Sequence, residues 1–149
     1  MGIKIPAEIS AGLNDDRLEV GSIFFTMVYD TKPPKQKYFV VVGFTKDSLV
    51  LGNVYINSEI NPNRFPSSEL KALHLPISVV DCPFLKWNSF VDCSEIYSKN
   101  VEEIKQLIGK GDSPYVGSLP SSVIQNILLL LQSAITIPLF KKRKFGIVP

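Results

Sequence analysis

Three lysines close together are the first side chains in this sequence that could do chemistry. The stretch 32–37 holds Lys32, Lys35 and Lys37, and a Pro-Pro pair lies between the first two of them. The prolines restrict the backbone, so the ammonium groups are held outward. Such a group of cations could hold an anion such as a phosphate, and the alternative is a solvated basic loop without a ligand.

Acid–base candidates lie farther along the chain. Asp92 and Ser94 belong to a strand-like segment, and an aspartate exposed at the end of a strand could accept a proton. The alternative for Asp92 is a cap on a turn. His74 is of the residue type best suited to proton transfer near neutral pH. It alternates with two leucines, which favours a strand-face histidine without a catalytic role.

Aromatic side chains could stack on the bases of a single-stranded nucleic acid. The candidates are Tyr38, Tyr55, Phe65 and Trp87, and Trp87 directly follows Lys86. The alternative is that most of these rings belong to the core. The formal net charge of +2 does not by itself indicate nucleic-acid binding.

The two cysteines and the single histidine predict no metal site and no cofactor. Cys82 and Cys93 are too far apart for a ligand pair, and we interpret both as unreactive, reduced thiols. Two cysteines and no recognisable signal peptide favour a cytoplasmic protein. The length of 149 residues is typical of one domain with a real core.

A strongly bent antiparallel sheet or barrel must position these side chains. Runs rich in β-branched and aromatic residues predict strands over 22–29, 38–42 and 49–56, and the short links between them require antiparallel pairing. Gly52-Asn53 inside the third run marks a bulge or a close approach of another backbone. An edge strand over 73–80 and a short strand over 89–94 follow, which makes the fold mainly β with C-terminal helices.

The C-terminal third is predicted to be helical. Asn100 is the expected N-cap of a helix over 101–108 that ends at Gly109 or Gly111, and a connector over 112–120 leads to a second helix from 123 to about 135. This second helix is apolar almost all round but too short to cross a bilayer, so we expect it against the sheet or in a subunit interface. The predicted parts are an N-terminal arm (1–20), a barrel (21–98), helices on the barrel or a dimer interface (99–140) and a basic tail (141–149).

Three segments resemble the PemK/MazF-like toxins of bacterial toxin–antitoxin systems. Gly21-Ser-Ile-Phe24 is similar to the family's opening strand. The run 37–42, Lys-Tyr-Phe-Val-Val-Val, lies where the family has Arg-Pro followed by Val and Ile. The segment 89–96, Ser-Phe-Val-Asp-Cys-Ser-Glu-Ile, resembles the family's Val-Asp-Cys-Ser-Gln-Ile strand. The likeness extends over most of the chain, from about 21 to 137.

The resemblance implies an SH3-like barrel that acts as a homodimeric, metal-independent endoribonuclease on single-stranded RNA and is neutralised by an antitoxin protein. It implies no membrane span and no DNA or other cofactor. Carried onto this sequence, it gives two sets of site residues. The catalytic set is Lys37, Asp92 and Ser94, and the substrate-binding set is Lys32, Lys35, Tyr38, Tyr55, Asn57 and Lys86.

Two departures from the family pattern put activity in question. Lys37 stands where the family has its catalytic arginine, and Tyr38 replaces the proline that follows. The third strand offers Tyr55, Asn57 or Ser58 where the family commonly has Ser or Thr. Lysine lacks the planar fork of arginine, but its charge still stabilises a phosphorane. The alternative function is a non-catalytic SH3-like module for a peptide or protein, and a third is a peripheral membrane protein using the last helix and Lys141–Lys144.

Overall fold

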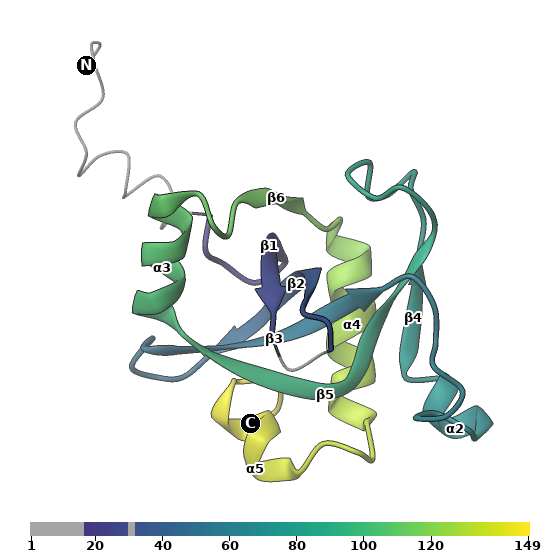
Figure 1. Cartoon of the computed structure of the whole chain (residues 1–149). Coiled ribbons are helices and arrows are strands. Elements are labelled where there is room, and N and C mark those ends of the chain that lie inside the picture. Colours follow the sequence, from purple (N-terminus) through teal and green to yellow (C-terminus); the bar gives the residue numbers. More distant parts are fainter. Residues whose placement is uncertain (1–16, 30–31) are drawn as a thin grey trace.

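The computed structural model describes residues 17–29 and 32–149, so most of the predicted N-terminal arm lies outside the described residues. Figure 1 shows a curved sheet with helices packed around it. The strands are β1 (Ser22–Val28), β2 (Lys35–Phe44), β3 (Val50–Asn57), β4 (His74–Ile77), β5 (Ser89–Asn100) and β6 (Tyr115–Ser118). The helices are α2 (Ser68–Lys71), α3 (Val101–Lys110), α4 (Ser121–Ser133) and α5 (Leu139–Lys144).

The six strands form one sheet in the order β4-β5-β3-β2-β1-β6, and all of the neighbouring pairs are antiparallel. The sheet bends into a half-barrel that is followed along the chain by the C-terminal helices (Figure 1). The prediction of a small, bent, antiparallel sheet with C-terminal helices is therefore confirmed.

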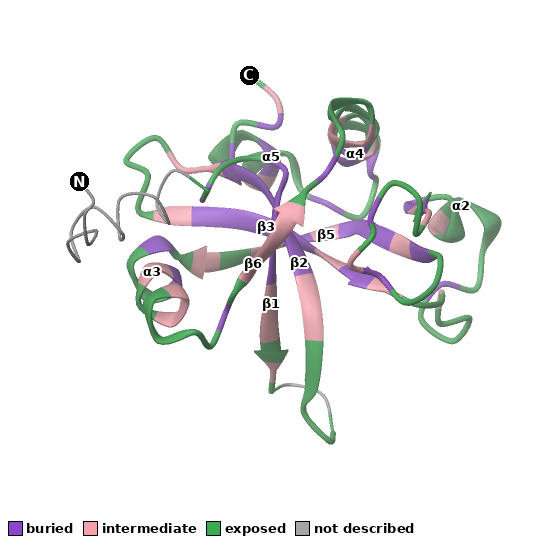
Figure 2. Ribbon diagram, turned by 90° about the horizontal axis from the view of Figure 1, so that it is seen from above, coloured by how far each residue is buried: buried purple, intermediate pink, exposed green. Residues whose placement is uncertain are grey.

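Figure 2 shows that buried residues lie at the centre of the sheet, and these residues belong to two separate cores, one on each face. On one face, Val40 and Val54 join a large core that includes Ile127 of α4. On the other face, Phe39 and Leu51 join a smaller core that is closed by Ile104 of α3. Burial on both faces explains why the strand runs are continuously apolar rather than alternating.

The C-terminal half differs from the prediction in two strands. β5 does not stop at 94 but runs over 12 residues, from Ser89 to Asn100. Asn100 is the predicted cap of α3, and its side chain accepts a hydrogen bond from the backbone N–H of Glu103 at 3.1 Å. The connector over 112–120 contains β6, which pairs with the far side of β1. The part of β5 beyond residue 94 and the short β6 carry few apolar residues and take their conformation from the strands beside them.

The segment 141–149, which was predicted as a basic tail, is partly helical and partly buried. Lys141 to Lys144 lie in α5, and Phe145 and Ile147 are buried in the large core. Lys142 is itself buried, and its ammonium donates to the carbonyl oxygens of Gln132 and Ala134 at 2.8 and 2.9 Å. This lysine satisfies carbonyls at the C-terminal end of α4, which is where a cation is favoured.

α4 lies against the sheet, as predicted. Ile127 and Leu131 are buried in the large core, whereas Leu129 is 60% exposed on the outer side of the helix. Within the described residues, no helix is both long and apolar enough to span a bilayer.

Candidate functional site

The strand register brings four of the predicted site residues to one face of the sheet. Tyr55 of β3 lies opposite Phe39 of β2 on one side and opposite Asp92 of β5 on the other. Lys37 lies two residues before Phe39, and Asn57 two residues after Tyr55, so both point to this same face. The face belongs to the smaller core, against which Tyr55 packs.

Two lysines gather around the ring of Tyr55. The ammonium of Lys37 donates to Oδ1 of Asn57 at 2.9 Å and lies 5.6 Å from the centroid of the Tyr55 ring. The ammonium of Lys99 donates to the hydroxyl of Tyr55 at 2.8 Å and lies 4.9 Å from the same centroid. Lys99 also lies 5.0 Å from the centroid of the Phe39 ring. We call Lys37, Tyr55, Asn57, Tyr97 and Lys99 the lysine–tyrosine cluster.

Tyr97 adds a second phenol to the lysine–tyrosine cluster. Its ring centroid lies 4.9 Å from that of Tyr55, and the two planes are tilted by 57°. Burial raises the pKa of Tyr97, and a hydrogen bond with the side chain of Arg64 opposes that rise. Arg64 lies exposed beside Phe65, with its guanidinium 4.9 Å from the centroid of that ring. The cluster therefore combines cations with aromatic faces, as surfaces that bind single-stranded nucleic acids do.

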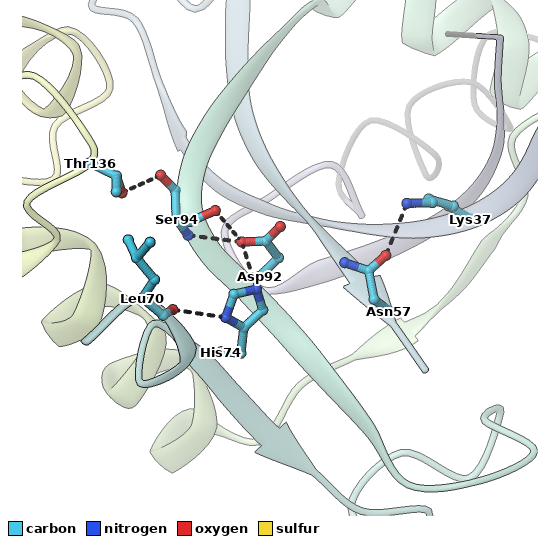
Figure 3. Close-up of polar contacts among 7 residues, drawn as sticks. All are labelled: Lys37, Asn57, Leu70, His74, Asp92, Ser94 and Thr136. Carbon is cyan, nitrogen blue, oxygen red and sulfur yellow. Dashed lines mark hydrogen bonds and ion pairs between the residues drawn. The ribbon is translucent and has the colours of Figure 1, made fainter. Parts of the chain in front are cut away.

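Asp92 is not exposed at a strand end, so that prediction is wrong. It lies inside the long β5 and is only 4% exposed. Oδ1 of Asp92 accepts hydrogen bonds from the backbone N–H and the hydroxyl of Ser94, at 2.9 and 2.5 Å. Figure 3 shows these contacts and the separate pair of Lys37 and Asn57. Because its carboxylate is buried and already bonded, Asp92 supports the local backbone rather than facing a substrate.

His74 lies next to the Asp92 carboxylate. Its Nε2 is 3.5 Å from Oδ1 of Asp92, an ion-pair distance without hydrogen-bond geometry, and its Nδ1 lies 3.2 Å from the carbonyl oxygen of Leu70 (Figure 3). The hydroxyl of Ser94 donates to Asp92 and not to His74. The three side chains therefore lack the order of contacts that activates a serine nucleophile, in which the histidine accepts from the hydroxyl.

The remaining predicted binding residues are divided between the two faces. Lys32 and Lys35 are exposed near the turn between β1 and β2, and Lys35 shares its side of β2 with Lys37. Tyr38 points to the opposite face, where its ring packs against those of Phe25 and Phe84. The distances between ring centroids are 4.7 and 4.9 Å. Lys86 is exposed in the loop that carries Phe84. Tyr38 therefore does not join the lysine–tyrosine cluster.

Sequence reasoning missed Lys99 and Tyr97. Both lie in the part of β5 beyond residue 94, where the strand was predicted to have ended. Ile96-Tyr97, two residue types that favour strands, was the available signal for a longer strand. β3 and β5 have a register shift between Asn53 and Tyr55. As a result, Tyr55 pairs with Asp92, whereas Asn53, only two residues away, pairs with Tyr97.

The two thiols lie in the interior, in agreement with their interpretation as unreactive. Cys82 and Cys93 are both free and buried in the large core. Burial, together with the neighbouring charge of Asp92, raises the pKa of Cys93 to about 12, and burial also raises the pKa of Cys82. A thiol with a raised pKa forms little of the reactive thiolate near neutral pH.

The half-barrel and its C-terminal helices define the class: the fold is that of the PemK/MazF-like toxins, as the sequence resemblance predicted. A chain in the crystal structure of MazE–MazF (form III) from Deinococcus radiodurans is similar to this one with a TM-score of 0.54. The likeness covers 82% of this chain and 99% of that chain at 8% sequence identity, and thus concerns the fold. No protein-family model and no curated protein matches the sequence.

Proposed function

We propose that this chain is the toxin component of a toxin–antitoxin system and a metal-independent endoribonuclease that cleaves single-stranded RNA in the cytoplasm. The observation that carries the proposal is the position of Lys37, held by Asn57 beside the Tyr55 ring on one face of a MazF-like half-barrel. Lys37 stands where the sequence resemblance places the family's catalytic arginine.

The chemistry of RNA cleavage suggests roles for these side chains. Attack of a 2′-hydroxyl on the adjacent phosphorus builds negative charge on the phosphoryl oxygens, and a fixed cation stabilises that charge. We assign this role to Lys37, whose ammonium is oriented by Asn57. The proton of the attacking 2′-hydroxyl passes to solvent water, and the P–O5′ bond breaks as the new bond forms. The departing 5′-oxygen needs a proton, and we assign its donation to the hydroxyl of Tyr55. Asp92 and Ser94 act as positioning residues that hold β5 in its bulged form.

The protein partners follow from the same fold. The similar chain belongs to a complex of MazE with MazF, which supports an antitoxin as the partner of this chain. We also propose a homodimer, because large apolar side chains are exposed on α4, on the segment that follows it and on α5. Leu129 is 60% exposed, Ile135 76% and Phe140 69%. Analytical ultracentrifugation of the purified chain tests this assignment, and a monomer at micromolar concentration would contradict it.

Cleavage of a labelled single-stranded RNA in the presence of EDTA tests the nuclease. We expect the full chain to cut without added metal and Lys37→Ala to lose about 10²-fold or more of the rate, the loss typical of removing one group that stabilises the transition state. Lys144→Ala is the matched control, because Lys144 is exposed on α5 next to Phe145 of the large core. Equal rates for the wild type and Lys37→Ala would overturn the assignment of Lys37.

A second function is favoured by the burial of Asp92. Asp92 and Ser94, the two acid–base candidates on β5, are buried and hydrogen-bonded to each other. A domain that only binds its partner needs no acid or base that faces the ligand. A non-catalytic SH3-like module would bind a peptide or protein partner through the same face. Tight binding of such a partner, with no cleavage of RNA, would favour this second function over the nuclease.

A further inference from the structure

We infer that Arg64 holds a phosphate of the bound RNA strand through two hydrogen bonds from its guanidinium group. The inference rests on the proposed binding of single-stranded RNA. It adds to that site a residue from the loop between β3 and α2, to which the sequence resemblance assigned no role. It concerns binding and does not require that the RNA be cut.

The strand register places this loop on the face of the lysine–tyrosine cluster. His74 of β4 lies opposite Asp92 of β5, which in turn lies opposite Tyr55 of β3. Residues directly opposite each other on neighbouring strands point to the same face of a sheet. The ring of Phe65 packs edge-on against that of His74, with the two centroids 4.2 Å apart. The part of the loop around Phe65 therefore lies on the same face as Tyr55, near the β4 edge of the sheet.

A turn that is anchored in the protein holds the backbone of Arg64. Phe65 is buried, and its backbone N–H and that of Arg64 donate to the carbonyl oxygen of Asn61, at 3.0 and 3.2 Å. The side-chain oxygen of Asn61 also accepts from the backbone N–H of Asn63 at 2.9 Å. Because this turn is already ordered, a ligand bound by Arg64 has little loop ordering to offset.

The guanidinium of Arg64 is positioned by aromatic side chains and not by an acidic residue. It lies 4.9 Å from the centroid of the Phe65 ring and is hydrogen-bonded to the side chain of Tyr97, a member of the lysine–tyrosine cluster. Among the residues that the structure describes, no carboxylate lies within ion-pair distance of Arg64. The charge of this exposed side chain is therefore left to an anionic ligand.

A phosphate is the anion that suits this arrangement. A guanidinium has five N–H donors in one plane and can give two parallel hydrogen bonds to the oxygens of one phosphate. Lysine lacks this planar fork, so the two residue types can be told apart at such a site. Phosphate contacts position a nucleic acid without reading its bases, and we therefore expect Arg64 to fix the path of the strand and not its sequence.

The salt dependence of binding tests the inference, because each phosphate contact releases counterions. The probe is a fluorescent 2′-O-methyl oligoribonucleotide of eight residues, which lacks the attacking hydroxyl and is therefore not cut. Fluorescence anisotropy gives its affinity for the full chain over a range of KCl concentrations. We expect Arg64→Gln to reduce the slope of log K against log[KCl] by about 0.7. Arg143→Gln is the matched control and should keep the wild-type slope, because Arg143 is exposed on α5, which Phe145 anchors in the large core.

The variant Arg64→Lys separates the charge from the planar fork. It keeps the positive charge and should therefore keep the wild-type slope. Its affinity at one KCl concentration should be about tenfold lower, the loss of about one charge-assisted hydrogen bond. A wild-type affinity for Arg64→Lys would overturn the assignment of two hydrogen bonds.

The outcomes separate this inference from the proposed nuclease. If the wild type binds the probe and Arg64→Gln has the wild-type slope, the inference is overturned and cleavage in EDTA is untouched. If the wild type does not cut RNA and Arg64→Gln has a reduced slope, the nuclease is overturned and the inference is supported. Failure of the wild type to bind the probe overturns both. Because the Arg64 side chain is exposed, Arg64→Gln should keep the wild-type circular dichroism spectrum, so that a changed slope reports a lost phosphate contact.

Discussion

The substitution Gly52→Ala should destabilise the protein by placing a methyl group against the Phe145 ring and the Ile96 side chain. A Cβ atom at Gly52 would lie 2.8 Å from Cγ of Phe145 and 2.9 Å from Cγ2 of Ile96, both closer than carbon atoms approach in proteins. Gly52→Ala should therefore lower the free energy of unfolding by about 1–3 kcal/mol, the usual effect of overpacking a core. Phe145 is 2% exposed, and Phe145→Ala should cost about 3–5 kcal/mol.

The double variant measures how far the two sites are coupled. Phe145→Ala removes the ring that the new methyl group meets, so Gly52→Ala should cost less in that background, by about 1–2 kcal/mol. The relief is partial, because the contact with Ile96 remains. Urea denaturation of the wild type, both single variants and the double variant gives the four free energies, provided that the slope with denaturant stays constant.

Gly43 supplies the matched control. A Cβ atom there would lie 2.1 Å from the main-chain carbonyl oxygen of Phe145, which Phe145→Ala retains. Gly43→Ala should therefore be destabilising in both backgrounds, without relief. Additivity within about 0.5 kcal/mol at Gly52, or equal relief at Gly43 and Gly52, would refute the packing of the Phe145 ring described above.

Four further predictions concern stability and thiol chemistry. Asn100→Ala removes the side-chain cap of α3 and should cost about 1 kcal/mol in urea denaturation. Asn53→Leu should stabilise the fold by about 1 kcal/mol in the same assay, because both polar atoms of its buried side chain lack a partner among the described residues. Asp92→Asn should cost about 2 kcal/mol or more and broaden the NMR signals of His74, and an unchanged stability would contradict the supporting role. The pKa of Cys93 is raised from 9.0 to about 12 by folding, so the unfolded thiol ionises first and stability should fall by about 1.4 kcal/mol per pH unit between these values. Cys93→Ala should lack this alkaline loss.

Local patterns in the sequence predicted much of the fold. Strand residues and short links indicated the hairpins of β1, β2 and β3. Asn100 indicated the start of α3, and of the two glycines that were expected to end it, Gly111 does so while Gly109 lies inside the helix. Gly52 was expected to mark a bulge or the close approach of another backbone. The partner strand β2 has a register shift between Val41 and Gly43 beside it, whereas the group that approaches Gly52 is the side-chain ring of Phe145 and not a backbone. These features depend on backbone conformations that single residue types prefer, which is why they can be predicted one at a time.

Features that depend on distant contacts were not predictable. The segment 141–144 looked like a solvated charged run because nothing nearby shows that Lys142 meets the end of α4 or that Phe145 fills the space above Gly43 and Gly52. β6 has four residues and exists as a strand because β1 offers an open edge. In both cases tertiary structure overrides the local preference of the chain.

The candidate site was predicted in part. Lys37, Tyr55 and Asn57 meet on one face, as an antiparallel pairing of their strands requires. Asp92 was expected on the surface, because an aspartate within a strand is usually solvated. Its burial depends on contacts with Ser94 and His74, and the contact with His74 comes from another strand, so it could not be found from spacing alone.

The irregularity in β5 has a consequence for any search of this chain by sequence motif. Val91 and Cys93, before the irregularity, point into the large core, and so does Ile96 after it. Odd-numbered residues therefore face the large core before the irregularity, and even-numbered residues face it afterwards. Asp92 and Lys99 thus both border Tyr55 although their separation of seven residues would place them on opposite sides of a regular strand. Removal of one residue between 93 and 96 would restore a regular alternation there, and would thereby exchange the faces of the side chains along the remainder of β5.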